Sequence, residues 1–147
     1  MKISAKALTL GLICAAGIAY AKEGVQNPIV KTRMDTMDVI RANTAILGDM
    51  AGDKAPFDEA KATEAAAALS AAATTIPQVF EPEETDPVSE ALPDIWNKPD
   101  EFGVKAETLY KAAQSIDTAS LDGVRAGMGA IGGACKSCHE SFRMKKE

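Results

Sequence analysis

The sequence predicts an all-α protein, built as an antiparallel up-down-up-down bundle of four helices. Three observations support this fold class. Apolar and alanine residues recur with a period near 3.6 in four segments, proline and glycine separate these segments, and no stretch shows the sustained alternation of β-branched residues that is typical of strands. Four such helices joined by short connections bury their apolar stripes against one another in this arrangement.

Residues 1–21 have the composition of a signal peptide. Lysines stand near the start, residues 7–21 are uncharged, and Ala19-Tyr20-Ala21 matches the small-x-small pattern that signal peptidases cleave. The uncharged run is shorter than the roughly 20 apolar residues that span a bilayer, so we expect no membrane span in the mature chain. We therefore expect cleavage before Lys22, export to the periplasm, and a single four-helix domain over residues 22–147.

The first half of the bundle is predicted to contain two long helices. The first begins near Pro28, a residue tolerated in a first turn, and ends between Met50 and Gly52. Its expected buried stripe consists of Val30, Arg33, Met37, Ile40, Thr44 and Leu47. The second follows Pro56, begins with acidic residues that suit the positive end of a helix, and is expected to stop before Pro77.

The second half begins with a connection rich in prolines and acids. Residues 81–100 hold four prolines and seven acidic residues, which predicts a solvent-exposed loop. A third helix is expected from about Pro99 to Ser115, and a fourth with Ser120 as its N-cap. The stripe of the fourth helix is Val124, Met128, Ile131, Cys135, Cys138 and Phe142, and its last turn is expected to hold the basic residues Arg143, Lys145 and Lys146.

The motif Cys135-Lys136-Ser137-Cys138-His139 carries the strongest chemical signal in the chain, because C-x-x-C-H is the pattern of covalent c-type haem attachment. On a helix, residues three and four apart share a face, so two thiols can bond the haem vinyl groups while the imidazole approaches the iron. We expect one haem c per chain. His139 is the single histidine, so it is the candidate proximal ligand, and bis-histidine ligation within one chain is excluded.

Two other uses of this motif fit the chain less well. A closed zinc site needs four Cys or His ligands, whereas the chain after the predicted cleavage site has three. A thioredoxin-like redox pair accompanies a βαβ unit, which an all-α chain lacks.

The glycines at positions 127, 129, 132 and 133 lie just upstream of the C-x-x-C-H motif, and each costs about 1 kcal/mol in a helix. Close approach of a planar group or of a neighbouring helix would explain them, and fraying of a weak helix is the alternative.

Charge and residue inventory exclude several function classes. Without the two lysines of the predicted leader, 14 basic residues stand against 21 acidic ones, so a nucleic acid is not an expected partner. No nucleophile paired with a base, second metal site or phosphate-binding loop is present, and we expect no enzymatic activity.

The opposite face of the iron needs a ligand from another helix. The first helix offers Met34, Met37 and Met50, of which Met37 lies on the apolar stripe. Methionine sulfur is a soft ligand, and a His/Met pair raises the reduction potential of haem iron. Periodicity alone leaves two interpretations of Met37 open, a core side chain and an axial ligand.

The carboxyl end of the chain, Ile131–Arg143 (IGGACKSCHESFR), resembles that of class II c-type cytochromes. The resemblance extends to Arg33-x-x-x-Met37, to Pro56-Phe57-Asp58, and to Ile95-Trp96 followed by Phe102. It implies the four-helix bundle predicted above. A methionine four residues after the arginine is similar to the low-spin cytochrome c-556 branch, whereas cytochromes c-prime carry a non-ligating residue there. By this resemblance Met37 is the distal ligand, Arg33 lies at the haem propionates, and Trp96 and Phe102 wall the haem.

The function implied by these observations is electron transfer in the periplasm by one His/Met-ligated haem, with redox proteins as partners. Lys136, Lys145 and Lys146 are candidates for a docking rim, since redox encounters use small, electrostatically steered surfaces. The alternative is a five-coordinate, c-prime-like protein that binds nitric oxide or carbon monoxide. A homodimer through the first two helices, with haem in a structural role, is the interpretation the sequence supports least.

Overall fold

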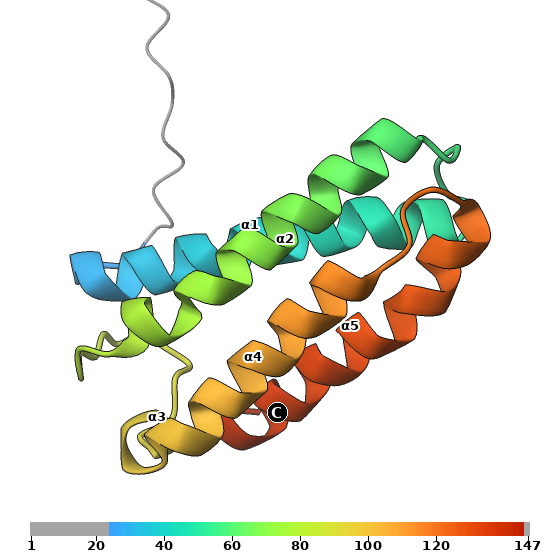
Figure 1. The fold of residues 1–147 in the computed structure, drawn as a ribbon. Helices are drawn as coiled ribbons and strands as arrows, with labels where there is room; N and C mark the ends of the chain where they lie inside the picture. The colour runs from blue at the N-terminus through green and yellow to red at the C-terminus, as the bar shows by residue number, and fades with distance from the viewer. Residues whose placement is uncertain (1–23, 146–147) are drawn as a thin grey trace, which may run out of the picture.

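The computed structural model describes residues 24–145, which form five α-helices (Figure 1). They are α1 (Pro28–Ala51), α2 (Glu59–Phe80), α3 (Asp94–Asn97), α4 (Pro99–Ser115) and α5 (Leu121–Phe142). Within this described part the regular secondary structure is entirely helical, which confirms the predicted fold class. The predicted signal peptide, residues 1–21, lies outside the described residues.

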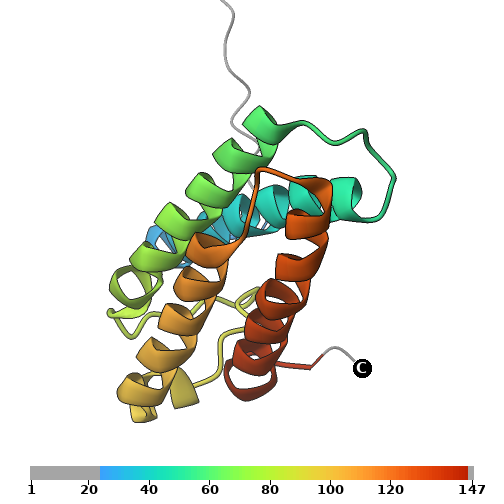
Figure 2. The ribbon, with the colours of Figure 1, turned by 45° about the vertical axis from the view of Figure 1, so that its right-hand side comes forward.

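The four long helices form the bundle, and each contacts two others. The pairs in contact are α1 with α2, α2 with α4, α4 with α5, and α5 with α1. Figure 2 shows α4 and α5 side by side with α1 inclined to both. The largest fully buried side chains are Leu47, Leu69, Ile131, Val30 and Val124, which come from three of these helices. The core therefore runs along the predicted apolar stripes.

Local capping chemistry explains where the long helices begin. The Asn27 side chain accepts hydrogen bonds from the backbone N–H groups of Ile29 and Val30, next to a proline that suits a first turn. Asp58 caps α2 in the same way, and Ser120 caps α5 as predicted. The starts of α1, α2 and α5 are thus determined within a few residues of sequence, whereas α4 begins at Pro99 without a side-chain cap.

The predicted end of the second helix is wrong, because α2 continues through Pro77 to Phe80. An interior proline costs about 3 kcal/mol, since it removes one hydrogen bond and crowds the preceding turn. Ile76 and Phe80 are 3% and 9% exposed. Burial of such side chains contributes about 1.5 to 3 kcal/mol each, which offsets the cost of the proline.

The loop predicted for residues 81–100 contains a short helix, α3, and a buried acid. Ile95 of α3 is buried, and the Trp96 indole Nε1 donates a 2.8 Å hydrogen bond to the carbonyl of Phe80. Asp86 is 7% exposed, and its carboxylate accepts hydrogen bonds from the N–H groups of Gln26, Asn27 and Val88. Part of the acidic segment therefore holds the start of α1 in place instead of lying free in solvent.

The basic residues predicted for the last turn of α5 lie beyond it. The helix ends at Phe142, and Arg143 is extended and forms an antiparallel bridge with Ala91. The bridge is flanked by hydrogen bonds from Leu92 N to Phe142 O (3.0 Å) and from Met144 N to Glu90 O (2.8 Å). These bonds compete with a further helical turn, so Lys145 follows the helix, and Lys146 lies outside the described residues.

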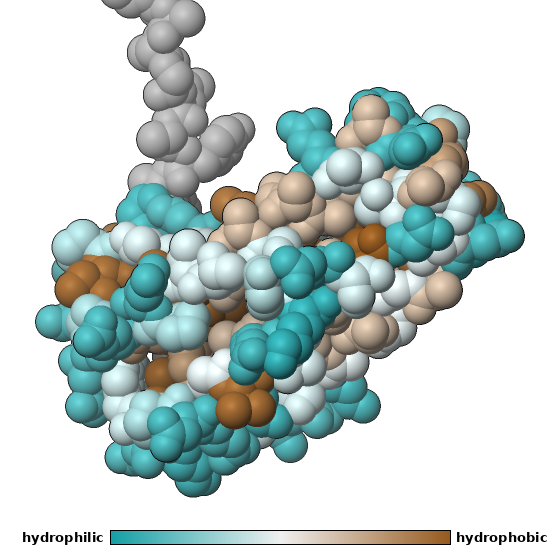
Figure 3. Space-filling model, in the orientation of Figure 1, coloured by the Kyte–Doolittle hydropathy of each residue, from teal (hydrophilic) through white to brown (hydrophobic). Residues whose placement is uncertain are grey.

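The face drawn in Figure 3 mixes hydrophilic and weakly hydrophobic residues, with strongly hydrophobic ones in small patches. The large hydrophobic side chains exposed within the described residues are Val39, Ile46, Val88, Val104 and Met144. No helix among residues 24–145 is long and apolar enough to cross a bilayer.

Candidate haem site

Cys135, Cys138 and His139 lie on the last turns of α5, where the three-and-four spacing places them on one side of the helix. Both thiols are free and half-buried, and His139 is exposed. Burial raises the pKa of the Cys135 thiol, and it raises the pKa of Cys138 against the opposing charge of Lys105. Neither thiol is in a disulfide, so both are available for the thioether bonds predicted from the sequence.

The charges around His139 favour its neutral form. Although His139 is exposed as a residue, partial desolvation of its imidazole lowers the pKa, the Arg143 cation lowers it further, and Glu90 opposes both effects. Arg143 is in turn held by Glu90 through a 2.6 Å hydrogen bond from Nε and an ion pair. Neutral imidazole is the form that ligates metals, so this environment suits an iron ligand.

The register between α1 and α5 can be read from two contacts at one end of the pair. Arg125 Nε donates to the carbonyl of Ala51, and a Cβ at Gly48 would lie 3.5 Å from the Met128 side chain. The helices are antiparallel, so a step back along α1 corresponds to an equal step forward along α5.

Met37 stands eleven residues before Gly48, and His139 stands eleven residues after Met128. The same register therefore places Met37 at the level of His139, about 16 Å from the contact end. Met37 is half-buried and packs against the core. Figures 1 and 2 show α1 and α5 diverging toward this level. Met34, the neighbouring candidate, is half-buried too and falls one turn further along, at the level of Phe142.

Arg33 is 2% exposed, and its guanidinium donates to three backbone carbonyls. The acceptors are Val79 (3.0 Å), Glu84 (2.8 Å) and Pro82. Burial lowers the pKa of Arg33, and the neighbouring Glu84 opposes this effect. The resemblance assigned Arg33 to a haem propionate, and that assignment stays a prediction. The carbonyl contacts show a second use of the same donors, which is to hold the end of α2 and the following loop.

Four aromatic side chains form a cluster beside Arg33. Arg33 lies 5.2 Å from the ring centroids of Phe80 and of the half-buried Trp96. Phe102 packs on Phe80 at 5.3 Å and edge-on to Phe142 at 5.2 Å. The cluster thus contains Trp96 and Phe102, which the resemblance named as haem-wall residues, and in addition Phe80 and Phe142. The sequence signal for Phe142 was its place on the α5 stripe, whereas Phe80 was missed because the helix was expected to end before Pro77.

The four glycines that lie just upstream of the C-x-x-C-H motif divide into two groups. A Cβ at Gly127 would lie 2.5 Å from the Ile116 side chain, so this glycine allows close approach of the α4–α5 turn. At Gly129, Gly132 and Gly133 a Cβ would meet no atom of the described residues within 4 Å. Gly132 precedes His139 by two helical turns on the same side of α5. Protein packing explains Gly127 alone among these four, and the side of α5 next to His139 stays open.

This donor set fits a covalently held haem. Two half-buried thiols and a neutral imidazole share one side of a helix, next to a glycine that no described residue covers. Within residues 24–145, no group of three or more His, Cys, Asp or Glu side chains is placed to hold a bare metal ion. The site therefore matches a c-type haem better than zinc.

The C-x-x-C-H motif on the last helix of a helical bundle places this protein in the class of c-type haem proteins. A family model described as Cytochrome C' matches residues 28–143, so the chain belongs to the cytochrome c' family. Proteins of this family carry one covalently attached haem c per chain, and this chain does so as well.

Similar proteins of known sequence and structure carry the same kind of name. A cytochrome c-554 from Cereibacter sphaeroides is 37% identical over 155 aligned positions, covering 97% of each chain. A cytochrome c-556 from Agrobacterium fabrum is 30% identical over 150 positions, covering 99% of this chain and 97% of the relative. The structure of cytochrome c' from Rhodopseudomonas palustris superposes with a TM-score of 0.74 at 28% identity, covering 83% of this chain and 100% of that one.

Proposed function

We propose that this protein is a mono-haem electron carrier of the periplasm, in which Cys135 and Cys138 hold the haem through thioethers. His139 is the proximal ligand of low-spin iron, and Met37 is the distal one. The observation that carries the proposal is the register that brings Met37 and His139 to one level on two antiparallel helices. Similarity to cytochromes c-554 and c-556 supports it.

The haem supplies the ferrous–ferric couple, and the chain sets its environment. The thioether of Met37 favours ferrous iron and raises the reduction potential. Because both axial positions are filled by side chains from long helices, a small gas reaches the iron only after Met37 dissociates. A fixed ligand set in both oxidation states suits electron transfer, and we expect no bond-making catalysis by side chains.

Optical spectra of the haem-loaded protein test this assignment. We expect the wild type to be low-spin, to show a sulfur-to-iron charge-transfer band when oxidised, and to bind carbon monoxide only slowly when reduced. Met37→Leu should become high-spin and bind carbon monoxide, because leucine fills the space without a ligating atom. Met34→Leu is the matched control, one turn away on the same helix, and should leave the spectrum unchanged. A Met34→Leu variant that alone turns high-spin would transfer the ligand role to Met34.

The second candidate function is gas binding at five-coordinate iron. It is favoured by a cytochrome c' from Rhodopseudomonas palustris, 30% identical and covering 99% of each chain. A wild type that is already high-spin and takes up carbon monoxide would establish this function and make Met37 a core residue.

Export and partners follow from the same proposal. Residues 1–21 act as a cleavable signal peptide, and redox proteins of the periplasm dock near the end of α5. Lys136 there has 76% of its side chain exposed and forms a loose 3.8 Å pair with Glu140, so a partner's acids can compete for it.

A further inference from the structure

The last turn of α1 is completed by a side chain from α5. A helix ends with four carbonyls that have no partner within the helix. Backbone N–H groups of residues 52–55 satisfy the first three of these carbonyls in α1. The fourth, on Ala51, accepts a 3.0 Å hydrogen bond from Nε of Arg125. Since α1 has no basic residue in its last turn, Arg125 also supplies the cation that favours a helix carboxyl end.

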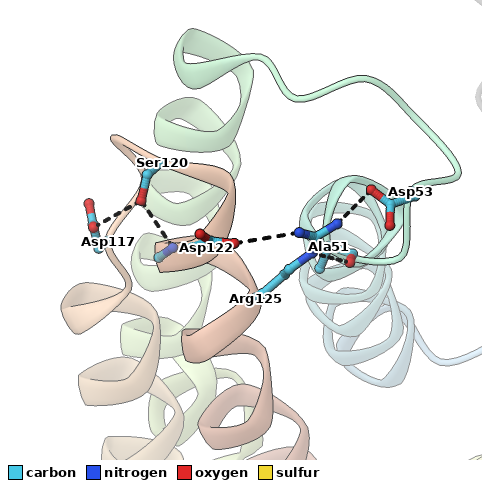
Figure 4. A network of polar contacts seen from close by, with 7 residues as sticks. Ala51, Asp53, Asp117, Ser120, Asp122 and Arg125 are labelled. Atoms are coloured by element: carbon cyan, nitrogen blue, oxygen red, sulfur yellow. Dashed lines mark hydrogen bonds and ion pairs between the residues drawn. The ribbon is translucent and has the colours of Figure 1, made fainter.

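The same guanidinium holds the turn that follows α1. Nη2 of Arg125 lies 2.6 Å from Asp53 Oδ1, and Nη1 lies 3.5 Å from Asp122 Oδ1 (Figure 4). Asp53 has a φ of 57°, in the left-handed region, where aspartate is tolerated better than most residues. Arg125, Ala51 and Asp53 together are called the Arg125 clamp here. It joins the end of α1 to the second turn of α5.

The clamp lies at one end of a long lever. Met37 precedes Ala51 by fourteen residues, so its sulfur lies about 21 Å along α1 from the clamp. Over that length, a rotation of roughly 3° about the clamp moves the sulfur by about 1 Å, whereas metal–ligand distances tolerate about 0.2 Å. A small rotation of α1 at the clamp therefore produces a large displacement of the Met37 sulfur at the level of His139.

We propose that the Arg125 clamp is a positioning device for axial ligation: by fixing the end of α1 against α5, it sets how closely Met37 approaches the iron held by His139. This inference rests on the proposed function, since it requires Met37 as ligand. The clamp itself is exposed, with 39% of the Arg125 side chain and 73% of the Asp53 side chain accessible. Exposed ion pairs contribute little to stability, so the clamp's effect should be seen in ligation more than in melting.

The test measures how fast Met37 leaves the iron. Carbon monoxide binds ferrous haem only after Met37 dissociates, so the limiting rate at saturating carbon monoxide reports that dissociation. We expect Arg125→Gln to raise this rate at least three-fold and to weaken the sulfur-to-iron band. Arg125→Lys keeps the charge but cannot reach Ala51 and Asp53 together, so its rate should fall in between. Asp53→Asn tolerates the same φ and should raise the rate as well.

Arg41→Ala is the matched control, because Arg41 is an exposed arginine of α1 whose ion pair with Asp38 stays within that helix. Its rate should equal that of the wild type. A low-spin wild type together with an Arg125→Gln variant of unchanged rate would overturn the inference and leave the proposed function standing, even if the variant melted earlier. A high-spin wild type that binds carbon monoxide at once would overturn both.

Discussion

Replacement of Arg33 by methionine tests a buried side chain that donates to three backbone carbonyls. The change removes three donors from the carbonyls of Val79, Pro82 and Glu84 and keeps a similar length of apolar chain. A hydrogen bond from a charged donor contributes about 1.5 to 3 kcal/mol when its acceptor stays buried. Pro82 is exposed and regains water, and Glu84 does so in part, so the loss is well below three full bonds.

Stacking adds a smaller contribution. The guanidinium lies against the rings of Phe80 and Trp96, and a cation on an aromatic face contributes about 0.5 to 2 kcal/mol. Together we expect Arg33→Met to lower the free energy of unfolding by about 2 to 4 kcal/mol. For a domain of this size, 3 kcal/mol lowers the melting temperature by about 10 °C.

The assay is urea unfolding of the haem-loaded protein, followed by far-ultraviolet circular dichroism. Arg33→Lys is the informative companion, because an ammonium keeps the charge but cannot serve three carbonyls in different directions. It should lose most of the stability lost in Arg33→Met. Full retention of stability by Arg33→Lys, or a loss below about 1 kcal/mol in Arg33→Met, would refute the stabilising role of the hydrogen bonds from Arg33 to the loop after α2. A shift in reduction potential without a loss of stability would favour the propionate role.

Two further predictions concern acid stability and helix packing. Backbone hydrogen bonds from Asn27, Val88 and Gln26, in that order, lower the pKa of Asp86, so its stabilising effect is complete above the unfolded pKa of about 3.9 and is lost as pH falls through the lower folded value. Asp86→Asn should therefore unfold more readily in urea at pH 6, and its deficit should shrink in strong acid. Gly127→Ala should destabilise by about 1 to 3 kcal/mol through overlap with the α4–α5 turn, whereas Gly129→Ala should stabilise by up to about 1 kcal/mol, both by thermal melting. Equal effects of the two alanines would contradict the packing seen at Gly127.

The sequence predicted those parts of the fold that depend on local information. Ser120 was predicted as a helix cap, and the structure adds Asn27 and Asp58; each bonds N–H groups within three residues, which explains why the helix starts could be predicted from short windows. The three anchors of the haem share one side of α5 for the same reason. Periodicity alone left Met37 open between core and ligand, because its level relative to His139 depends on how two distant helices pack, and only the family resemblance assigned it as the ligand.

The parts that the sequence did not predict depend on distant partners. The continuation of α2 through Pro77 follows from the burial of Phe80 against Phe102 on another helix. Trp96 belongs to a short helix because its indole reaches back to a carbonyl at the end of α2. Arg143 leaves the helix to pair with Ala91. In each case a long-range contact overrides a local preference, which no single window of sequence contains.

The alanine-rich buried face of α2 explains why α1 packs more closely on α2 than on α5. The buried face of α2 is mostly alanine, which lets α1 and α4 approach it closely, and α1 contacts α2 more extensively than it contacts α5. The α1–α5 seam is therefore the looser one: it is held at one end by the Arg125 clamp, and the two helices diverge away from that end. If the small side chains of α2 cause this divergence, replacing buried alanines of α2 by larger residues should bring α1 closer to α5. We therefore expect the seam between α1 and α5, rather than the alanine-lined seams of α2, to set the ligation of the iron.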